Sequence, residues 1–135
     1  MIKKQLIHAR TAVYNVNYHF VWCVKYRRKV LVDEIDKRLK EIFYEIAIKK
    51  GFIIKSMEIM PGHVHVFASA HPKLAPGYLY KMLKGISGRL LFIKFPEIKS
   101  KLWGGHLWNP ATYTETIGHV SEETILRYIE DQKSK

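Results

Sequence analysis

At 135 residues the chain is long enough to bury a real core, and we expect residues 1–135 to form a single domain. Its 23 Lys and Arg against 12 Asp and Glu give a net charge of +11, which favours a polyanionic partner such as nucleic acid. No apolar run approaches the roughly 20 residues of a membrane-spanning helix, and the one cysteine, Cys23, excludes an internal disulfide. With no secretion signal at the N-terminus, we expect a cytoplasmic protein that does not enter a membrane.

The first predicted elements are a strand and an amphipathic helix. Residues 13–25 alternate, with Val16, Tyr18, Phe20 and Trp22 on one parity and mostly polar residues on the other, which is typical of a strand with one buried face. Asp33 is a candidate N-cap for a helix with an apolar stripe, and Gly51 is its candidate C-terminal residue.

Three more strands and a last helix follow. Residues 52–60 and 63–70 have strand composition and meet at Pro61-Gly62, a turn-forming pair. A further strand is expected at 112–117. The final helix is expected to begin at Ser121, where Ser-Glu-Glu-Thr suits an N-cap with acidic residues in the first turn.

A second amphipathic helix, beginning at Pro76, lies between these strands. Gly85 and Gly88 within it each cost about 1 kcal/mol relative to Ala, which suggests that another backbone or a ligand approaches them closely. The element order predicts an α+β fold: a ferredoxin-like or RNA-recognition-like antiparallel sheet with helices on one face, plus a C-terminal helix. The other face of the sheet would then be left for a ligand or a partner.

Two histidines in the predicted strand 63–70 are candidate metal ligands. His63 and His65 are two residues apart, so they project from one face while Val64 and Val66 project from the other. Two imidazoles about 7 Å apart along a strand can converge on one metal ion. However, 7 histidines in 135 residues predict about 0.36 His-x-His pairs by chance, so the pair alone is weak support and a third ligand is needed.

Candidates for that third ligand lie in the last predicted helix. Tyr128 and Gln132 are four residues apart and share a helical face. Alternatively, Tyr128 extends the apolar stripe of Ile125 and Ile129, and Gln132 is simply solvated. The spacing itself leaves both interpretations open.

Taken together, these motifs resemble those of the single-tyrosine HUH transposases of the insertion sequence 200/605 group. The HVH motif at 63–65 matches the two histidines that flank a hydrophobic residue in that family, and YIEDQ at 128–132 matches its Tyr-x-x-x-Gln helix. The blocks NYHFVWCVKYRRKVL, LKGISGRLLFIKFP and LWNPATYTETIGHVSEETILRYIEDQ extend the resemblance over nearly the whole chain. Family members often carry Asp before the first histidine, where this chain has Gly62.

The resemblance implies cleavage and rejoining of single-stranded DNA, with Tyr128 as the nucleophile that forms a 5′-phosphotyrosine link. The C-terminal helix would thus carry the nucleophile. His63, His65 and Gln132 would hold a divalent metal ion, Mg²⁺ or Mn²⁺, because an amide oxygen is a hard ligand. Zinc prefers a thiolate or a third imidazole and is the less suitable ion.

Basic residues would contact the DNA phosphates in such an enzyme. The candidates are Arg10, Lys25, Arg27, Arg28, Lys84 and Arg89. Each of them alone is equally compatible with a solvated surface charge. Trp103 and Trp108 would either stack on bases or pack in the core or a dimer interface.

By the same resemblance we expect a homodimer whose composite sites join His63 and His65 of one subunit to the Tyr128 helix of the other, with Gly118 as a hinge. The substrate would be single-stranded DNA with hairpins at the ends of a mobile element. Two alternatives stay open: a domesticated relative that processes repeated extragenic hairpins, and a non-catalytic nucleic-acid-binding module of RNA-recognition type. Cleavage that depends on Tyr128 would separate the enzymes from the module.

Overall fold

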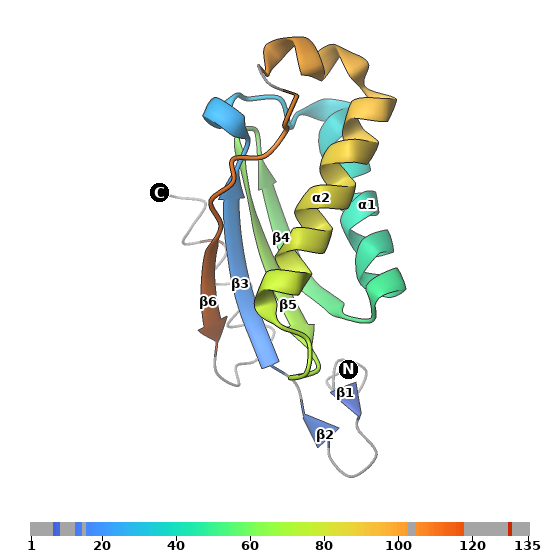
Figure 1. Ribbon diagram of the computed structural model, residues 1–135, viewed down its shortest axis with the longest axis vertical. Helices are drawn as coiled ribbons and strands as arrows, with labels where there is room; N and C mark the ends of the chain where they lie inside the picture. Colours follow the sequence, from blue (N-terminus) through green and yellow to red (C-terminus); the bar gives the residue numbers. More distant parts are fainter. Residues whose placement is uncertain (1–6, 9–12, 15, 103–104, 118–129, 131–135) are drawn as a thin grey trace.

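The computed structural model describes residues 7–8, 13–14, 16–102, 105–117 and 130 (Figure 1). Two short strands near the N-terminus, β1 (Ile7–His8) and β2 (Val13–Tyr14), form a separate antiparallel pair. The elements in chain order are β1 (Ile7–His8), β2 (Val13–Tyr14), β3 (Val16–Cys23), the 3-10 turn η2 (Lys25–Arg27), α1 (Asp33–Lys50), β4 (Ile53–Met60), β5 (His63–Ala70), α2 (Pro76–Lys94), the 3-10 helix η3 (Pro96–Lys101) and β6 (Tyr113–Ile117).

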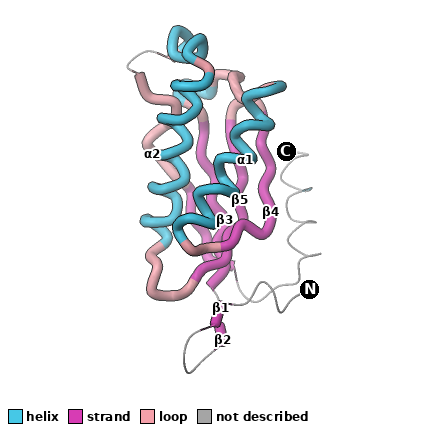
Figure 2. The backbone as a smooth tube through the Cα atoms, turned by 90° about the vertical axis from the view of Figure 1, so that its right-hand side faces the viewer, coloured by secondary structure: helices cyan, strands magenta, loops and turns pink. Residues whose placement is uncertain are grey.

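The main sheet has four strands in the order β4, β5, β3, β6, and all neighbours are antiparallel. The β3-α1-β4 connection therefore spans β5, and the β5-α2-β6 connection spans β3, which is the split βαβ arrangement of ferredoxin-like folds. Both helices cover the same face of the sheet (Figure 2). The predicted α+β class and helix placement are confirmed. Of the predicted C-terminal helix, only Glu130 lies within the described residues.

Strand boundaries agree with the predictions to within a few residues. The predicted strand 13–25 corresponds to β2 and β3, and it ends at Cys23 because Val24 bridges to Trp108 before the chain turns into η2. The strands predicted at 52–60 and 112–117 each begin one residue later, as β4 and β6. The strand predicted at 63–70 is β5.

The core lies between the sheet and the two helices. Apolar residues of one parity in β3 and β5, such as Phe20, Trp22 and Val66, face the helices and are almost fully buried. The α1 stripe that packs with them consists of Leu39, Ile42, Phe43 and Ile46. Burying one such side chain contributes about 1.5–3 kcal/mol, so this face of the sheet is where the fold is stabilised.

Helix α1 begins differently from the prediction and ends as predicted. Asp33 does not cap it: Val32 is the N-cap, and its carbonyl accepts from the amide of Ile35, while Asp33 is the first helical residue with φ 53°. In that left-handed conformation the Asp33 carboxylate forms no side-chain cap. At the other end Gly51 has φ 79°, and its amide donates to the Ala47 carbonyl, a left-handed C-cap that favours glycine.

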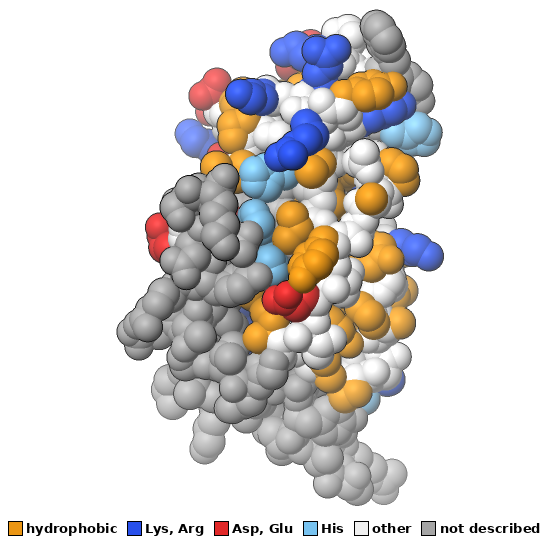
Figure 3. Space-filling model, turned by 90° about the vertical axis from the view of Figure 1, so that its left-hand side faces the viewer, with side chains coloured by type: hydrophobic (Ala, Val, Ile, Leu, Met, Phe, Trp, Pro, Cys, Tyr) orange, Lys and Arg blue, Asp and Glu red, His pale blue; other side chains and the backbone are white. Residues whose placement is uncertain are grey.

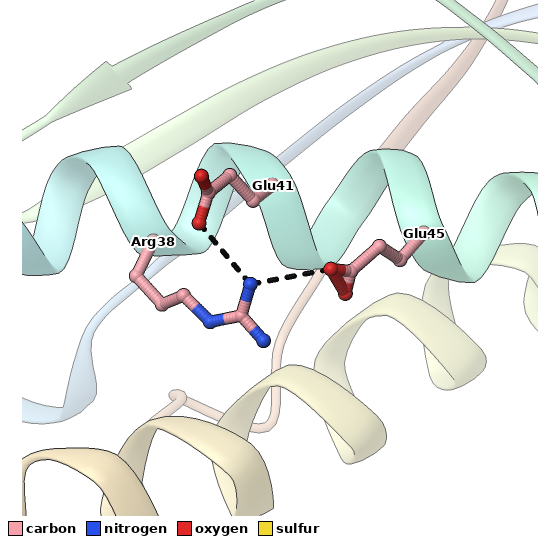
Figure 4. A network of polar contacts seen from close by, with 3 residues as sticks. All are labelled: Arg38, Glu41 and Glu45. Atoms are coloured by element: carbon pink, nitrogen blue, oxygen red, sulfur yellow. Dashed lines mark hydrogen bonds and ion pairs between the residues drawn. The ribbon is translucent and has the colours of Figure 1, made fainter.

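The solvent-facing side of α1 carries ion pairs. Arg38 Nη1 lies 3.1 Å from Glu41 Oε1 and 3.2 Å from Glu45 Oε1 (Figure 4). Exposed pairs of this kind are each worth about 0–1 kcal/mol, so they contribute little to the fold. Within the described residues, neither this helix nor any other is long and apolar enough to cross a membrane.

Among the described residues, no other backbone closely approaches the two glycines of α2, and the close approach of a ligand stays a prediction. A Cβ added to Gly85 would meet no atom of the described residues within 4 Å, and one on Gly88 would lie 3.6 Å from Trp108 Cδ1, an ordinary contact. Trp108 packs in the core: it is buried, meets Trp22 edge to face, and donates its indole N–H to Ser87 Oγ at 3.0 Å. Trp103 lies outside the described residues.

Candidate metal and DNA-binding site

The predicted histidine pair lies on the face of the sheet that is turned away from α1 and α2. In β5, His63 pairs with Cys23 and His65 with Val21, while Val64 and Val66 point into the core. The His63 and His65 rings are 5.2 Å apart, centroid to centroid, at 75°. We call this side of the sheet the histidine face, and Figure 3 shows histidine side chains gathered on it.

A third histidine, His19 of β3, belongs to the same cluster and was not assigned a role from the sequence. Its Nε2 lies 3.1 Å from Nδ1 of His65, and the two ring planes are within 13° of parallel, with their centroids 5.3 Å apart. Both side chains are buried, with exposed fractions of 1% for His19 and 5% for His65. The alternation in β3 places His19 on the polar parity, but only the pairing register between β3 and β5 brings it against His65.

Burial keeps these imidazoles neutral. It lowers the pKa of His65 to about 4, with smaller contributions from His19 and His63, and it lowers the pKa of His19 despite the opposing charge of Glu115. Burial and the nearby charge of Arg27 also lower the pKa of His63. A metal-ligating imidazole must be deprotonated, so near neutral pH the pair has the protonation state that a divalent ion requires.

The donors present fit such an ion in type but make an incomplete set. Among the described residues no three His, Cys, Asp or Glu side chains form a group able to hold a metal. The predicted third ligand, Gln132, and the predicted nucleophile, Tyr128, lie outside the described residues. Two neutral imidazoles on one face of the sheet can supply two nitrogen ligands to a divalent cation.

A basic turn lies beside His63. Three of the predicted DNA contacts, Lys25, Arg27 and Arg28, are in or next to η2, and Arg27 is close enough to affect the pKa of His63. The turn is fixed to the β4–β5 connection, since Val24 N donates to Gly62 O at 2.9 Å and Leu31 N to Pro61 O at 3.0 Å. Lys and Arg side chains gather at the same end of the histidine face (Figure 3).

Gly62 explains how close these two segments come. A Cβ at this position would lie 2.9 Å from the carbonyl oxygen of Arg27, a distance that side-chain-bearing residues do not show. The absence of a side chain at Gly62 therefore allows η2 to pack directly on the turn before His63.

Tyr26, at the centre of η2, is a second feature that the sequence did not reveal. Its side chain is 56% exposed, and both Tyr26 and Arg27 have left-handed backbone conformations, with φ 60° and 52°. Such conformations cost about 1 kcal/mol or more in non-glycine residues and often occur at functional sites. Lys25 Nζ lies 5.3 Å from the centroid of the Tyr26 ring.

The remaining predicted DNA contacts lie elsewhere. Lys84 of α2 is half-buried, and its ammonium is 2.8 Å from both Asn109 O and Thr112 Oγ1, so it ties α2 to the loop before β6. Arg89 is exposed and lines a hollow of about 530 Å³ together with Phe92, Lys99 and His106. Arg10 and the predicted hinge, Gly118, lie outside the described residues.

The fold and site together define a class of protein: an α+β domain with paired histidines on the face of a ferredoxin-like sheet opposite α1 and α2 (Figure 2), next to a basic turn. The family described as "Transposase IS200 like" matches residues 12–132. This chain therefore belongs to the IS200-like transposase family.

Individual relatives agree with that assignment. The chain is 45% identical over 126 residues to the ISDra2 transposase TnpA of Deinococcus radiodurans, covering 93% of this chain and 90% of the relative. It is 28% identical over 130 residues to the transposase for insertion sequence element IS200 of Salmonella typhimurium, covering 96% and 83%.

Solved structures show the same fold. A crystal structure of a proposed transposase from Deinococcus radiodurans superposes with a TM-score of 0.77 at 40% identity, covering 93% of this chain and 97% of that one. A REP-associated tyrosine transposase bound to a REP hairpin superposes with a TM-score of 0.59 at 14% identity, covering 90% and 66%. The second likeness concerns the fold alone.

Proposed function

We propose that this transposase cleaves and rejoins single-stranded DNA at hairpin-marked ends of a mobile element, using Tyr128 as its nucleophile and a divalent metal ion. The observation that carries the proposal is the pair of neutral imidazoles, His63 and His65, on one sheet face beside a basic turn. Membership of a transposase family supports DNA as the substrate.

In the proposed reaction the Tyr128 phenol loses its proton and its oxygen attacks the phosphorus of the cleaved linkage. The bond from phosphorus to the 3′ oxygen breaks, the 3′ oxygen gains a proton, and the 5′ phosphate stays joined to Tyr128. The phosphodiester energy is conserved in this link, so a 3′-hydroxyl can reverse the step without ATP. His63, His65 and Gln132 would hold Mg²⁺ or Mn²⁺, which supplies Lewis-acid polarisation of the phosphate.

The basic turn η2 is the proposed path of the single strand next to the reacting phosphate. Lys25, Arg27 and Arg28 supply positive charge there, and the exposed ring of Tyr26 offers a surface on which a base can stack. Outside η2, Arg89 and Arg10 are further candidate phosphate contacts. Lys84 is the weakest candidate, because its ammonium already has oxygen partners in the loop at 109–112.

We further propose a homodimer in which the Tyr128 helix of one subunit completes the histidine site of the other, with Gly118 as the hinge between β6 and that helix. The argument is the resemblance between this chain and the single-tyrosine transposases.

The test is a covalent capture assay. Purified protein is incubated with labelled single-stranded hairpin DNA from its own genomic flanks, with Mn²⁺ or with EDTA, and run on a denaturing gel. We expect a metal-dependent protein–DNA adduct that Tyr128→Phe abolishes. Tyr44→Phe, on the exposed side of α1, is the matched control and should leave the adduct intact.

Three other outcomes would contradict all or part of the proposal. DNA binding without any adduct, in either ion, would favour a binding module. An adduct that survives Tyr128→Phe would mean that another residue is the nucleophile. Hairpins beside the gene that lack element ends would instead favour a domesticated hairpin-processing relative.

A further inference from the structure

The hydrogen bond between His19 and His65 bears on how His65 can act as a ligand. Nδ1 of His65 lies 3.1 Å from Nε2 of His19, and both rings are buried. The Nδ1 position of His65 is therefore occupied within the protein. Only Nε2 of His65 remains for a metal ion.

The direction of that hydrogen bond decides whether Nε2 can bind. A neutral imidazole carries one proton, so one ring nitrogen donates and the other accepts. If His65 Nδ1 accepts from His19, the proton of His65 sits on Nε2 and blocks it. If His65 Nδ1 donates to His19, the lone pair of Nε2 is free. Metal-ligating histidines usually donate their other ring N–H in this way to a fixed acceptor, which sets the tautomer and the ring direction.

His19 is itself held in place by aromatic neighbours from two strands. Its ring stacks on Phe67 of β5, 4.4 Å away and only 6° from parallel, and it meets the edge of Tyr113 of β6 at 6.3 Å. With 1% of its surface exposed, the ring has little freedom to turn. An acceptor fixed in this way can define the orientation of the side chain that donates to it.

We propose that His19 is a positioning residue for the metal site: it accepts the Nδ1 proton of His65 and so leaves the Nε2 lone pair of His65 directed to the ion. This inference rests on the proposed function, because it assumes that His65 is a metal ligand. It assigns His19 no contact with the metal or the DNA.

The first test needs neither DNA nor metal. Long-range ¹H–¹⁵N spectra of the histidine-labelled, metal-free protein report which ring nitrogen of His65 carries the proton. We expect the Nδ1–H tautomer in the unmodified protein and loss of that preference in His19→Phe. His106→Phe, at an exposed position on the loop before β6, is the control and should leave the His65 signals unchanged. An Nε2–H tautomer in the unmodified protein would overturn the inference.

The second test measures Mn²⁺ affinity by calorimetry or electron paramagnetic resonance. We expect His19→Phe to weaken binding about 10–100-fold, the range for outer-sphere partners of metal ligands. His19→Gln, which retains an acceptor oxygen, should recover part of the loss, and a thermal unfolding curve on each variant confirms that it is folded. Unchanged affinity in folded His19→Phe would overturn the inference.

A third variant separates this inference from the proposed function. If His65→Ala abolishes Mn²⁺ binding but His19→Phe does not change it, the positioning role fails and the metal-dependent function stands. If neither substitution changes Mn²⁺ binding, His65 is not a metal ligand, and this result contradicts both the proposed metal site and the positioning role of His19.

Discussion

The two faces of the central sheet use the same strands for different purposes. On the helix-facing side, β3 and β5 present Phe20, Trp22 and Val66 to a close-packed core. On the histidine face the same strands present His19 and His65, the neighbours of Phe20 and Val66 in the sequence, and a hydrogen bond joins these two buried rings. Because side chains alternate along a strand, one short segment can place apolar residues in the core and histidines on the opposite face of the sheet.

The largest effect is expected from a substitution on the helix-facing side. Phe20→Ala removes a side chain with no exposed surface that contacts the rings of Tyr18 and Tyr80. We expect the free energy of unfolding to fall by about 3–5 kcal/mol, through lost burial and the cavity that remains. Urea denaturation followed by circular dichroism measures it. A loss below about 1 kcal/mol would mean that this face is not the main source of stability.

On the histidine face, the same kind of truncation should affect chemistry instead. His63→Ala is expected to reduce the Mn²⁺-dependent adduct by about 100-fold or more, since loss of an outer-sphere partner alone costs 10–100-fold at metal sites. Its free energy of unfolding should change by no more than about 1 kcal/mol, because His63 is only half-buried. The adduct assay and urea denaturation on one preparation test both statements. If this variant unfolds, the histidine face also stabilises the fold, which would contradict the proposed difference between the two faces.

The contact between η2 and the turn before His63 can be tested by adding a single methyl group. Gly62→Ala would place a Cβ 2.9 Å from Arg27 O, so η2 must shift, at a cost of about 1–3 kcal/mol in stability. Gly85→Ala is the matched control: no atom of the part of the chain that the structure describes lies within 4 Å of the added Cβ, and Ala should stabilise the helix by about 0.5–1 kcal/mol. Thermal unfolding should move the two variants in opposite directions. Equal shifts would refute the tight contact.

The smallest expected effect concerns the charges of η2. Arg27→Ser should weaken single-stranded DNA binding and reduce the slope of log K against log salt by about 0.7, as expected for one lost phosphate contact. Arg38→Ser serves as the control, because Arg38 lies on α1, outside η2, and forms ion pairs with Glu41 and Glu45 (Figure 4). Fluorescence anisotropy titrations at several salt concentrations give both slopes. An unchanged slope for Arg27→Ser would remove η2 from the DNA path.

Much of the fold could be predicted because it is local. Alternation in β3 and β5 and the apolar stripe of α1 are readable from neighbouring residues, and so is the placement of His63 and His65 on one face. The prediction that Asp33 is the N-cap of α1 was wrong because capping depends on the backbone conformation at Asp33, which is left-handed here. Composition near that residue carries no sign of it.

The features that were missed depend on pairing between distant segments. His19 and His65 are 46 residues apart, and their hydrogen bond exists only in the register that places His19 opposite Phe67 and Val21 opposite His65. The close packing of η2 on Gly62 likewise joins two segments that are distant in the sequence. Neither contact has a signal in the sequence, since strand register is set by the whole sheet.

The most direct test of the account is to locate the covalent link. The protein–DNA adduct formed in Mn²⁺ is digested with a protease and a nuclease, and the peptide that carries the residual nucleotide is identified by mass spectrometry. We predict modification of Tyr128 and no other residue. Modification of Tyr113, which is 54% exposed and lies on the histidine face beside His19, would contradict the account, as would an adduct that forms equally well in EDTA.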